Sequence, residues 1–216
     1  MKKLSKNAIC LLVFSVLSCF ASGSTLLLFT FDDEDEFTAA PSAFDSGFAY
    51  VSDWDSSGIL RNFAGESGQA IAHNGDNTFR FDVELAPGKG LLPHSVSFWA
   101  RRSSAGSPDW VFSVNDTPLA SASEMTDSAS GVEFGNVLLE PAITEPLAGE
   151  VFFTLETIGA SSGAGTFRVD NFTLHGTISP IPEPRYYAAA LGLIALAFVG
   201  WRHRAKRLGK PLGSVH

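Results

Sequence analysis

The chain has 216 residues, of which 45% are hydrophobic, enough for a sizeable core, and its formal net charge is −8. Residues 24–180 alone carry 22 Asp and Glu against six Lys and Arg, a net charge of −16, because nine of the fifteen basic residues lie at the two ends of the chain. So acidic a segment repels nucleic acid and anionic phospholipid, which argues against nucleic-acid binding and favours cations or neutral polysaccharide as partners.

Residues 1–23 have the pattern of a secretory signal peptide. Three lysines precede the apolar stretch Ala8–Phe20, and the small residues Ala21 and Gly23 occupy positions −3 and −1 of a cleavage site. This stretch of 13 residues is too short for a membrane-spanning helix, which needs about 20 residues. We therefore expect an exported protein that is cleaved after Gly23.

The same region contains an alternative signal. Residues 16–19 (Val-Leu-Ser-Cys) loosely resemble a lipobox, whose cysteine is lipidated and becomes the mature N-terminus. Cys10 and Cys19 are the two cysteines of the chain. Cleavage after Gly23 removes both, so it leaves a domain without disulfides, a thiol nucleophile or a cysteine-based metal site. The lipoprotein alternative would instead keep Cys19 as an acylated anchor.

Residues 24–178 have the pattern of one all-β domain. Phe79–Leu85 alternates strictly, with four apolar residues on one face and Arg80, Asp82 and Glu84 on the other. The same period of two runs through Val96–Arg101 and Val151–Glu156. Further strands are expected at Leu26–Phe31, Phe48–Trp54, Asp109–Asn115, Gly131–Leu139 and Gly165–Gly176. About eight short strands, separated by turn residues and without a helical period, predict an antiparallel β-sandwich or jelly roll.

The last of these strands contains an irregularity. Phe167 and Val169 share one parity, whereas Phe172 and Leu174 share the other. Since successive residues of a strand alternate between the two faces of a sheet, the two pairs can face the same side only if one extra residue is inserted between them. We therefore expect a β-bulge or a bend near Asp170 and Asn171.

Parts of the domain resemble known families. Arg168–Gly176 resembles the terminal strand of carbohydrate-binding jelly rolls. Ser95–Arg102, together with Trp110–Asn115, resembles extracellular sandwich domains. In several jelly-roll carbohydrate-binding modules, the aspartate of the terminal strand and acidic groups near the first strand bind a structural calcium ion.

This resemblance implies a calcium site in the present chain. An acidic run, residues 32–36, directly follows the first expected strand. The implied ligands are Asp32 or Asp33 together with Asp170, and they suit an ion that takes about six to eight oxygen ligands. The alternative is that the acidic run is a solvated turn whose charges are screened by water and salt.

Three tryptophans, Trp54, Trp99 and Trp110, are candidate glycan contacts. Sugar rings have apolar C–H faces that stack on aromatic side chains. Trp99 lies on the polar parity of its strand, Trp110 follows a polar loop, and Trp54 and Tyr50 flank Asp53. Because tryptophan is usually at least half-buried, the alternative is that these rings belong to the core.

The C-terminal tail combines three elements in a fixed order: Pro182-Glu183-Pro184, the apolar segment Tyr186–Trp201, and a basic cluster. The apolar segment would form a helix about 24 Å long, short for a hydrocarbon core of about 30 Å, and its terminal aromatic residues extend the span. The positive-inside rule places the cluster and residues 209–216 in the cytoplasm. The basic cluster, residues 202–207, contains Arg202, Arg204, Lys206 and Arg207.

This order resembles the PEP-CTERM sorting signal of Gram-negative bacteria, and the resemblance covers residues 179–208. It implies that Pro182, Glu183 and Pro184 are recognised by an exosortase, a membrane-embedded cysteine protease. It also implies transient residence in the inner membrane, followed by release to the cell surface or the extracellular space. The alternative is an ordinary single-pass anchor that is not processed.

Catalysis has little support in the sequence. There is no His-Glu-x-x-His motif or phosphate loop, and His73, His94 and His175 are scattered without metal-ligand spacing. We therefore expect a non-enzymatic protein of the cell surface or extracellular matrix, sorted by its tail and associated with exopolysaccharide or biofilm material. The alternative is a carbohydrate-binding module with a specific glycan ligand, and a glycan-active enzyme is less favoured.

Overall fold

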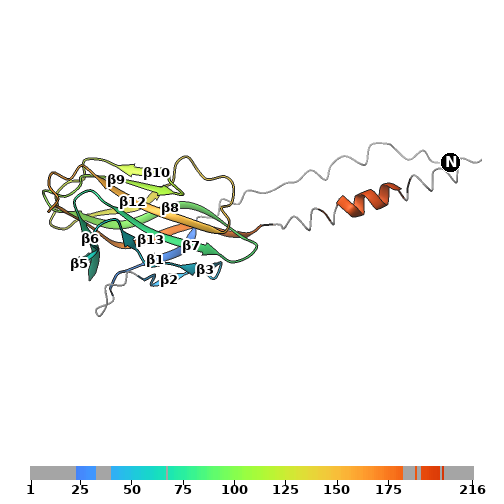
Figure 1. Cartoon of the computed structure of the whole chain (residues 1–216), viewed down its shortest axis with the longest axis horizontal. Coiled ribbons are helices and arrows are strands. Elements are labelled where there is room, and N and C mark those ends of the chain that lie inside the picture. The colour runs from blue at the N-terminus through green and yellow to red at the C-terminus, as the bar shows by residue number, and fades with distance from the viewer. Residues whose placement is uncertain are drawn as a thin grey trace, which may run out of the picture.

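The computed structural model describes residues 23–32, 40–66, 68–181, 188, 191–199 and 201. Within these residues the chain forms two β-sheets that share one apolar core and pack as a sandwich (Figure 1). Every strand pair in both sheets is antiparallel. The prediction of an all-β, antiparallel sandwich is therefore confirmed.

Sheet A has the strand order β11-β8-β13-β1-β2, and β6, followed by β5, pairs alongside β13. Its strands are β1 (Ser24–Phe29), β2 (Ala43–Phe44), β5 (Arg61–Ala64), β6 (Gln69–Asn74), β8 (Lys89–Arg102), β11 (Val132–Leu138) and β13 (Thr166–Pro180). Sheet B has the order β10-β9-β12-β7-β3, with β4 beside β7. Its strands are β3 (Phe48–Val51), β4 (Asp55–Ser56), β7 (Thr78–Leu85), β9 (Asp109–Val114), β10 (Thr117–Ala122) and β12 (Glu150–Ile158).

The core lies between the sheets and is built from the apolar positions of the alternating strands. The four apolar residues of β7 are at most 4% exposed, and the corresponding residues of β8 and β12 are equally buried. Aromatic rings meet across the interface: the Phe98 and Trp110 ring centroids are 5.1 Å apart, and those of Phe29 and Phe81 are 5.3 Å apart. Such pairs add about 0.5–1.5 kcal/mol beyond the area that they bury.

The predicted bulge in the last strand is present. The register of β13 against β8 shifts between Asp170 and Thr173, and Asn171 adopts a φ of 51°. As a result, Val169 and Phe172 are both fully buried in the core although they differ in parity. The bulge leaves Asp170 on the outer side of sheet A, next to the turn between β5 and β6.

Several elements were not expected, and each lacks an alternating pattern. In β6, Ala70–His73 are all buried, so no polar parity marks the strand. Strand β10 contains Pro118 and buries only Leu119, which is tolerated because it lies at the edge of sheet B. Strand β8 begins at Lys89, earlier than its alternating segment Val96–Arg101, because Lys89 pairs with Pro180. Strand β13 thus runs beyond the expected domain end at residue 178.

Residues 191–199 are helical and are drawn in orange-red in Figure 1. The large apolar side chains of this segment are 51–70% exposed. Among the described residues, no helix has both the length and the apolar character needed to cross a membrane. Residues 1–22 of the expected signal peptide, Pro182-Glu183-Pro184 and the basic cluster lie outside the described residues, so these assignments stay predictions.

Candidate functional site

Two of the three candidate tryptophans belong to the core. Trp54 is 4% exposed, and its ring packs against Phe81 at a centroid distance of 5.2 Å and against Phe172 at 5.0 Å. Trp110 is 1% exposed and packs edge-on against Phe98. Neither ring offers a face to a sugar, so the prediction that they form an exposed glycan platform is wrong. The core alternative holds because the two sheets close over both rings.

The third, Trp99, lies on the outer side of sheet A but is also covered. Its indole Nε1 donates a hydrogen bond to the Ser130 carbonyl oxygen at 3.0 Å. Gly131, with a φ of 74°, lies so close to the indole that a side-chain carbon at this position would overlap the ring. Trp99 is therefore only 3% exposed, and its predicted role as an open stacking surface is wrong. Main chain, not sugar, covers the ring.

Asp32 and Asp170, two of the predicted calcium ligands, both contact the turn between β5 and β6. Asp170 is 1% exposed and accepts hydrogen bonds from the Glu66 N–H at 2.8 Å and the Asn171 N–H at 2.7 Å. Asp32 accepts a weaker bond from the Gln69 N–H at 3.3 Å. Glycines at 65 and 68 permit this approach, because a methyl group at either position would overlap a carboxylate oxygen. The two aspartates therefore fasten one turn to sheet A.

These residues alone do not complete a calcium site. Burial, and to a lesser degree the charges of Glu66 and Asp170, raise the pKa of Glu133, so several carboxylates act on one another here. Within the described part of the chain, however, no three His, Cys, Asp or Glu side chains converge on a point that could hold a metal ion. Asp33 lies outside the described residues.

The outer face of sheet B carries an open aromatic side chain. Tyr50 of β3 is 56% exposed and pairs in register with Glu84 of β7, which pairs in turn with Glu150 of β12. With Ser52 and Asp82, these residues line a hollow of about 360 Å³. We call this surface, defined by Tyr50, Ser52, Asp82, Glu84 and Glu150, the Tyr50 face. It combines a free ring with several hydrogen-bond acceptors.

Neighbouring contacts hold part of the Tyr50 face in place. The Arg80 Nε donates a hydrogen bond to Asp82 Oδ1 at 2.8 Å, and the same guanidinium lies 4.3 Å from the centroid of the Phe152 ring. The Asp82 main-chain N–H donates to the Ser52 hydroxyl oxygen at 2.8 Å. Arg80 therefore covers Phe152 and orients Asp82, while the ring of Tyr50 stays open.

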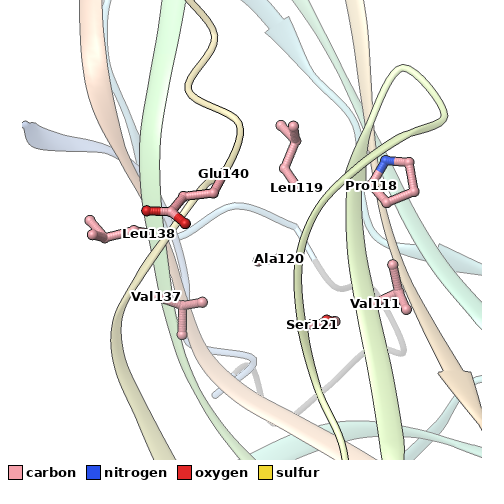
Figure 2. Close-up of a pocket in the computed structure, with 8 residues that line it drawn as sticks. All are labelled: Val111, Pro118, Leu119, Ala120, Ser121, Val137, Leu138 and Glu140. Carbon is pink, nitrogen blue, oxygen red and sulfur yellow. The ribbon is translucent and has the colours of Figure 1, made fainter.

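A second concavity lies between β10 and β11, the edge strands of the two sheets, and encloses about 520 Å³. Figure 2 shows Val137 and Leu138 on one side and Val111 and Pro118 on the other. Its lining is mainly aliphatic, with Glu140 as the carboxylate, and none of the described residues that line it is aromatic. Because no aromatic ring among these residues could stack on a sugar, we favour the Tyr50 face as the ligand site.

One catalytic pattern does occur in the sequence. Residues 159–163 read Gly-Ala-Ser-Ser-Gly, which matches the Gly-x-Ser-x-Gly pattern of hydrolase nucleophiles. That pattern requires a strand-to-helix turn, whereas Ser161 lies in an exposed connection between β12 and β13. The Ala160 N–H next to it donates to Asp76 Oδ1 at 2.7 Å. The match is therefore a surface turn without the structural context of a nucleophile.

Alternation in the sequence predicts that Asp82 and Glu84 face outwards but does not mark them as a site. Tyr50 stands out in the sequence only as a neighbour of Asp53. The missing information was strand pairing: Tyr50, Glu84 and Glu150 become neighbours because β3, β7 and β12 are adjacent in sheet B. The polar parity of Glu84 and Glu150 was the one signal that could have suggested an outward-facing acidic surface.

No protein-family model matches the chain, and no curated protein matches it. Among solved structures, the chain is similar to a family 35 carbohydrate-binding module from an environmental isolate, with 18% identity and a TM-score of 0.41 over 73% of this chain and 98% of that one. It is similar to the CBM22-1 xylan-binding domain of Paenibacillus barcinonensis Xyn10C, with 14% identity and a TM-score of 0.42 over 72% and 96% of the two chains. It is also similar to a CBM36 module in complex with calcium and xylotriose, with 11% identity and a TM-score of 0.34 over 56% and 98%. Scores of this size assign neither a family nor a ligand to the chain.

Proposed function

We propose that the domain is a non-catalytic carbohydrate-binding module whose glycan lies on the Tyr50 face. One observation carries the proposal: the Tyr50 side chain, which is 56% exposed, lies in register with Glu84, which pairs with Glu150, and the three residues line one hollow. A ring with hydrogen-bond acceptors beside it suits a sugar, which is apolar on its face and polar at its edge.

The chemistry of the site follows from these groups. The C–H face of a pyranose would stack on the Tyr50 ring, and the hydroxyls at its rim would donate hydrogen bonds to Asp82, Glu84 or Glu150. The Arg80 guanidinium holds the Asp82 carboxylate, and the Asp82 main-chain N–H holds the Ser52 hydroxyl, before the ligand arrives. Groups fixed in advance lower the entropic cost of binding.

The test is a glycan-binding screen with the purified protein, followed by titration of the best ligand with variants. Tyr50→Ala is expected to weaken binding about tenfold, equivalent to about 1.4 kcal/mol, and Tyr50→Phe to retain most of the affinity because the ring remains. Leu138→Ala removes a side chain of similar exposure, 58%, in the groove between β10 and β11 and serves as the control. Loss of binding in the control but not in Tyr50→Ala would move the site to that groove.

We also propose that the domain is exported and released from its tail as a PEP-CTERM substrate, which sets its glycan binding in cell-surface or exopolysaccharide material. The exposed apolar side chains of residues 191–199 support a membrane-directed segment, since such a surface is unfavourable in water. Mass spectrometry of the mature C-terminus tests this. A C-terminus upstream of Tyr186 is expected, and exported protein that keeps Tyr186–His216 would contradict it.

A structural calcium ion bound by Asp32 or Asp33 with Asp170 stays a prediction from the sequence. The shared contact of Asp32 and Asp170 with the turn between β5 and β6 supports it, because an ion there would bridge the turn and sheet A. If calcium is bound, a chelator lowers the melting temperature of the purified protein, and added calcium restores it. An unchanged melting temperature would remove the ion from the proposal.

A further inference from the structure

Charge is distributed unequally between the two sheets. The strands of sheet A contain five basic residues and two acidic ones, whereas those of sheet B contain one basic residue and six acidic ones. The charged residues of sheet A are Arg61, Lys89, Arg101, Arg102, Arg168, Glu133 and Asp170. Those of sheet B are Arg80, Asp55, Asp82, Glu84, Asp109, Glu150 and Glu156. The Tyr50 face therefore lies on the more acidic of the two sheets.

Two carboxylates of the Tyr50 face oppose each other directly. Glu84 of β7 and Glu150 of β12 are register partners, and like charges at directly opposed positions of an antiparallel pair repel each other. In the described part of the chain, the one ion pair joins Arg80 to Asp82, so neither glutamate has a basic side chain within salt-bridge distance. A cationic group bound between them would relieve this repulsion.

The arrangement suits an extended cationic ligand better than a single metal ion. Among the described residues, no three carboxylates or histidines converge closely enough to share one ion, although several line the same hollow. Tyr50 of β3 and the two carboxylates, Glu84 of β7 and Glu150 of β12, lie in a row across three adjacent strands. A ligand with one apolar ring face and separate positive groups would meet both the tyrosine and the carboxylates.

We propose that the Tyr50 face binds an amino-sugar polysaccharide, a polymer of glucosamine whose free amino groups are protonated. One pyranose ring lies on Tyr50, and the ammonium groups of that residue and its neighbour pair with Glu84 and Glu150. This inference rests on the proposed glycan binding at the same face, and it adds the class of sugar. Charge-assisted hydrogen bonds from ammonium to carboxylate are about twice as strong as neutral ones, so they would supply selectivity over acetylated or neutral chains.

The experiment compares three oligosaccharides of equal length: a glucosamine hexamer, its fully N-acetylated form and a neutral glucose hexamer. Each is titrated calorimetrically into the purified full-length protein at physiological salt. We expect the glucosamine hexamer to bind at least about tenfold more tightly than the other two, and its affinity to fall steeply with added salt. The double variant Glu84→Gln/Glu150→Gln is expected to lose about tenfold for glucosamine.

A matched control separates this site from general attraction to an acidic protein. Asp127→Asn/Glu145→Gln removes the same charge from two exposed positions outside both sheets and is expected to change affinity less than twofold. An equal loss of affinity in this control variant overturns the inference.

Tight binding of calcium that depends on Glu84 and Glu150 also overturns the inference. Equal, Tyr50-dependent binding of all three hexamers overturns the inference but leaves the proposed function standing, whereas binding of no glycan in the screen or in these titrations removes both.

Discussion

The outer faces of the two sheets differ in what lies over their aromatic residues. On sheet A, the main chain at Ser130 and Gly131 covers Trp99, which is 3% exposed. On sheet B, Tyr50 is 56% exposed and lies beside Glu84 and Glu150. Both side chains are at outward-facing strand positions, so the position in the strand does not decide accessibility. What decides it is whether another segment of the chain packs over the ring.

This difference suggests that the outer face of sheet A serves the stability of the fold and the Tyr50 face serves ligand binding. The outer face of sheet A is fastened by buried polar groups, with Asp170 accepting two main-chain N–H groups and Trp99 donating to a carbonyl. Changes on this face are therefore expected to lower the free energy of unfolding. Changes on the Tyr50 face are expected to affect ligand affinity with little effect on folding. Single substitutions on each face, together with titration of one buried histidine, test this division.

Trp99→Ala is expected to destabilise the domain by about 3–5 kcal/mol, because it removes a large buried ring and leaves a cavity under Gly131. Urea unfolding measures the loss. If folded protein is recovered, its glycan affinity should equal that of the wild type. Trp99→Phe, which keeps an aromatic ring, should lose less stability. A selective loss of glycan binding in stable Trp99→Ala protein would return this tryptophan to the ligand site.

Acid is expected to destabilise the domain through His73, which lies between the sheets. Its ring is fully buried, 4.2 Å from the Phe79 ring centroid, and burial lowers its pKa from 6.5 to about 4. The folded state binds this proton less readily than the unfolded state does. The free energy of unfolding is therefore unaffected by His73 above pH 6.5 and falls as the pH drops from 6.5 towards 4. The loss amounts to about 3 kcal/mol below that range.

This pH effect is measured by urea unfolding at several pH values, with His73→Phe as the comparison. The variant should have a flatter dependence between pH 6.5 and 4, because the titrating group is gone. The pKa of Asp76 is lowered, mainly by the Ala160 N–H and to a smaller degree by the charge of His73, so this carboxyl titrates below the pH window of the comparison. An equally steep decline in the variant would show that His73 is not responsible.

Asp170→Ala is expected to cost about 2 kcal/mol, because the N–H groups of Glu66 and Asn171 lose a buried acceptor. The turn between β5 and β6 should then exchange amide hydrogens faster, while sheet B remains protected. Asp127→Ala, at an exposed loop position, should change stability by less than about 0.5 kcal/mol. Equal stability of the two variants would contradict the role that we assign to Asp170.

Arg80→Ala is expected to have the smallest effect on stability, below about 1 kcal/mol, because its ion pair with Asp82 is partly exposed. The change uncovers Phe152, over which the guanidinium lies, and frees the Asp82 carboxylate. On the Tyr50 face, removing this cation should raise affinity for the glucosamine hexamer modestly. Reduced affinity would instead identify Arg80 as a ligand contact.

Local pattern was sufficient for much of the fold. Period-two alternation identified the core positions of β7, β8 and β12, and the parity change in β13 identified the bulge at Asp170. Strands without alternation were not predicted. In β6 four consecutive residues are buried, and β10 lies at the edge of its sheet and contains Pro118. Alternation of apolar and polar residues reveals a strand only where one face of the strand is buried and the other is exposed to solvent.

The candidate site was harder to anticipate, because its residues come from separate strands. Trp54, Trp99 and Trp110 were selected by residue type, and all three are buried. In the sequence, Tyr50 is only a neighbour of Asp53, and Glu150 is one of many acidic residues. The contacts that bring Tyr50, Glu84 and Glu150 together are pairings between distant segments, which no local pattern encodes.

Composition and alternation are enough to predict an acidic all-β domain, the inward-facing residues of its regular strands and the change of parity in β13. These properties follow from the two-residue repeat of a strand and from summed charge, which are local or additive. That Trp99 is covered while Tyr50 is open, and that Glu84 pairs with Glu150, is visible only in the folded domain. The burial of an outward-facing side chain and the register of strand pairs depend on how distant segments pack. The local sequence of a strand does not encode which segment packs over it.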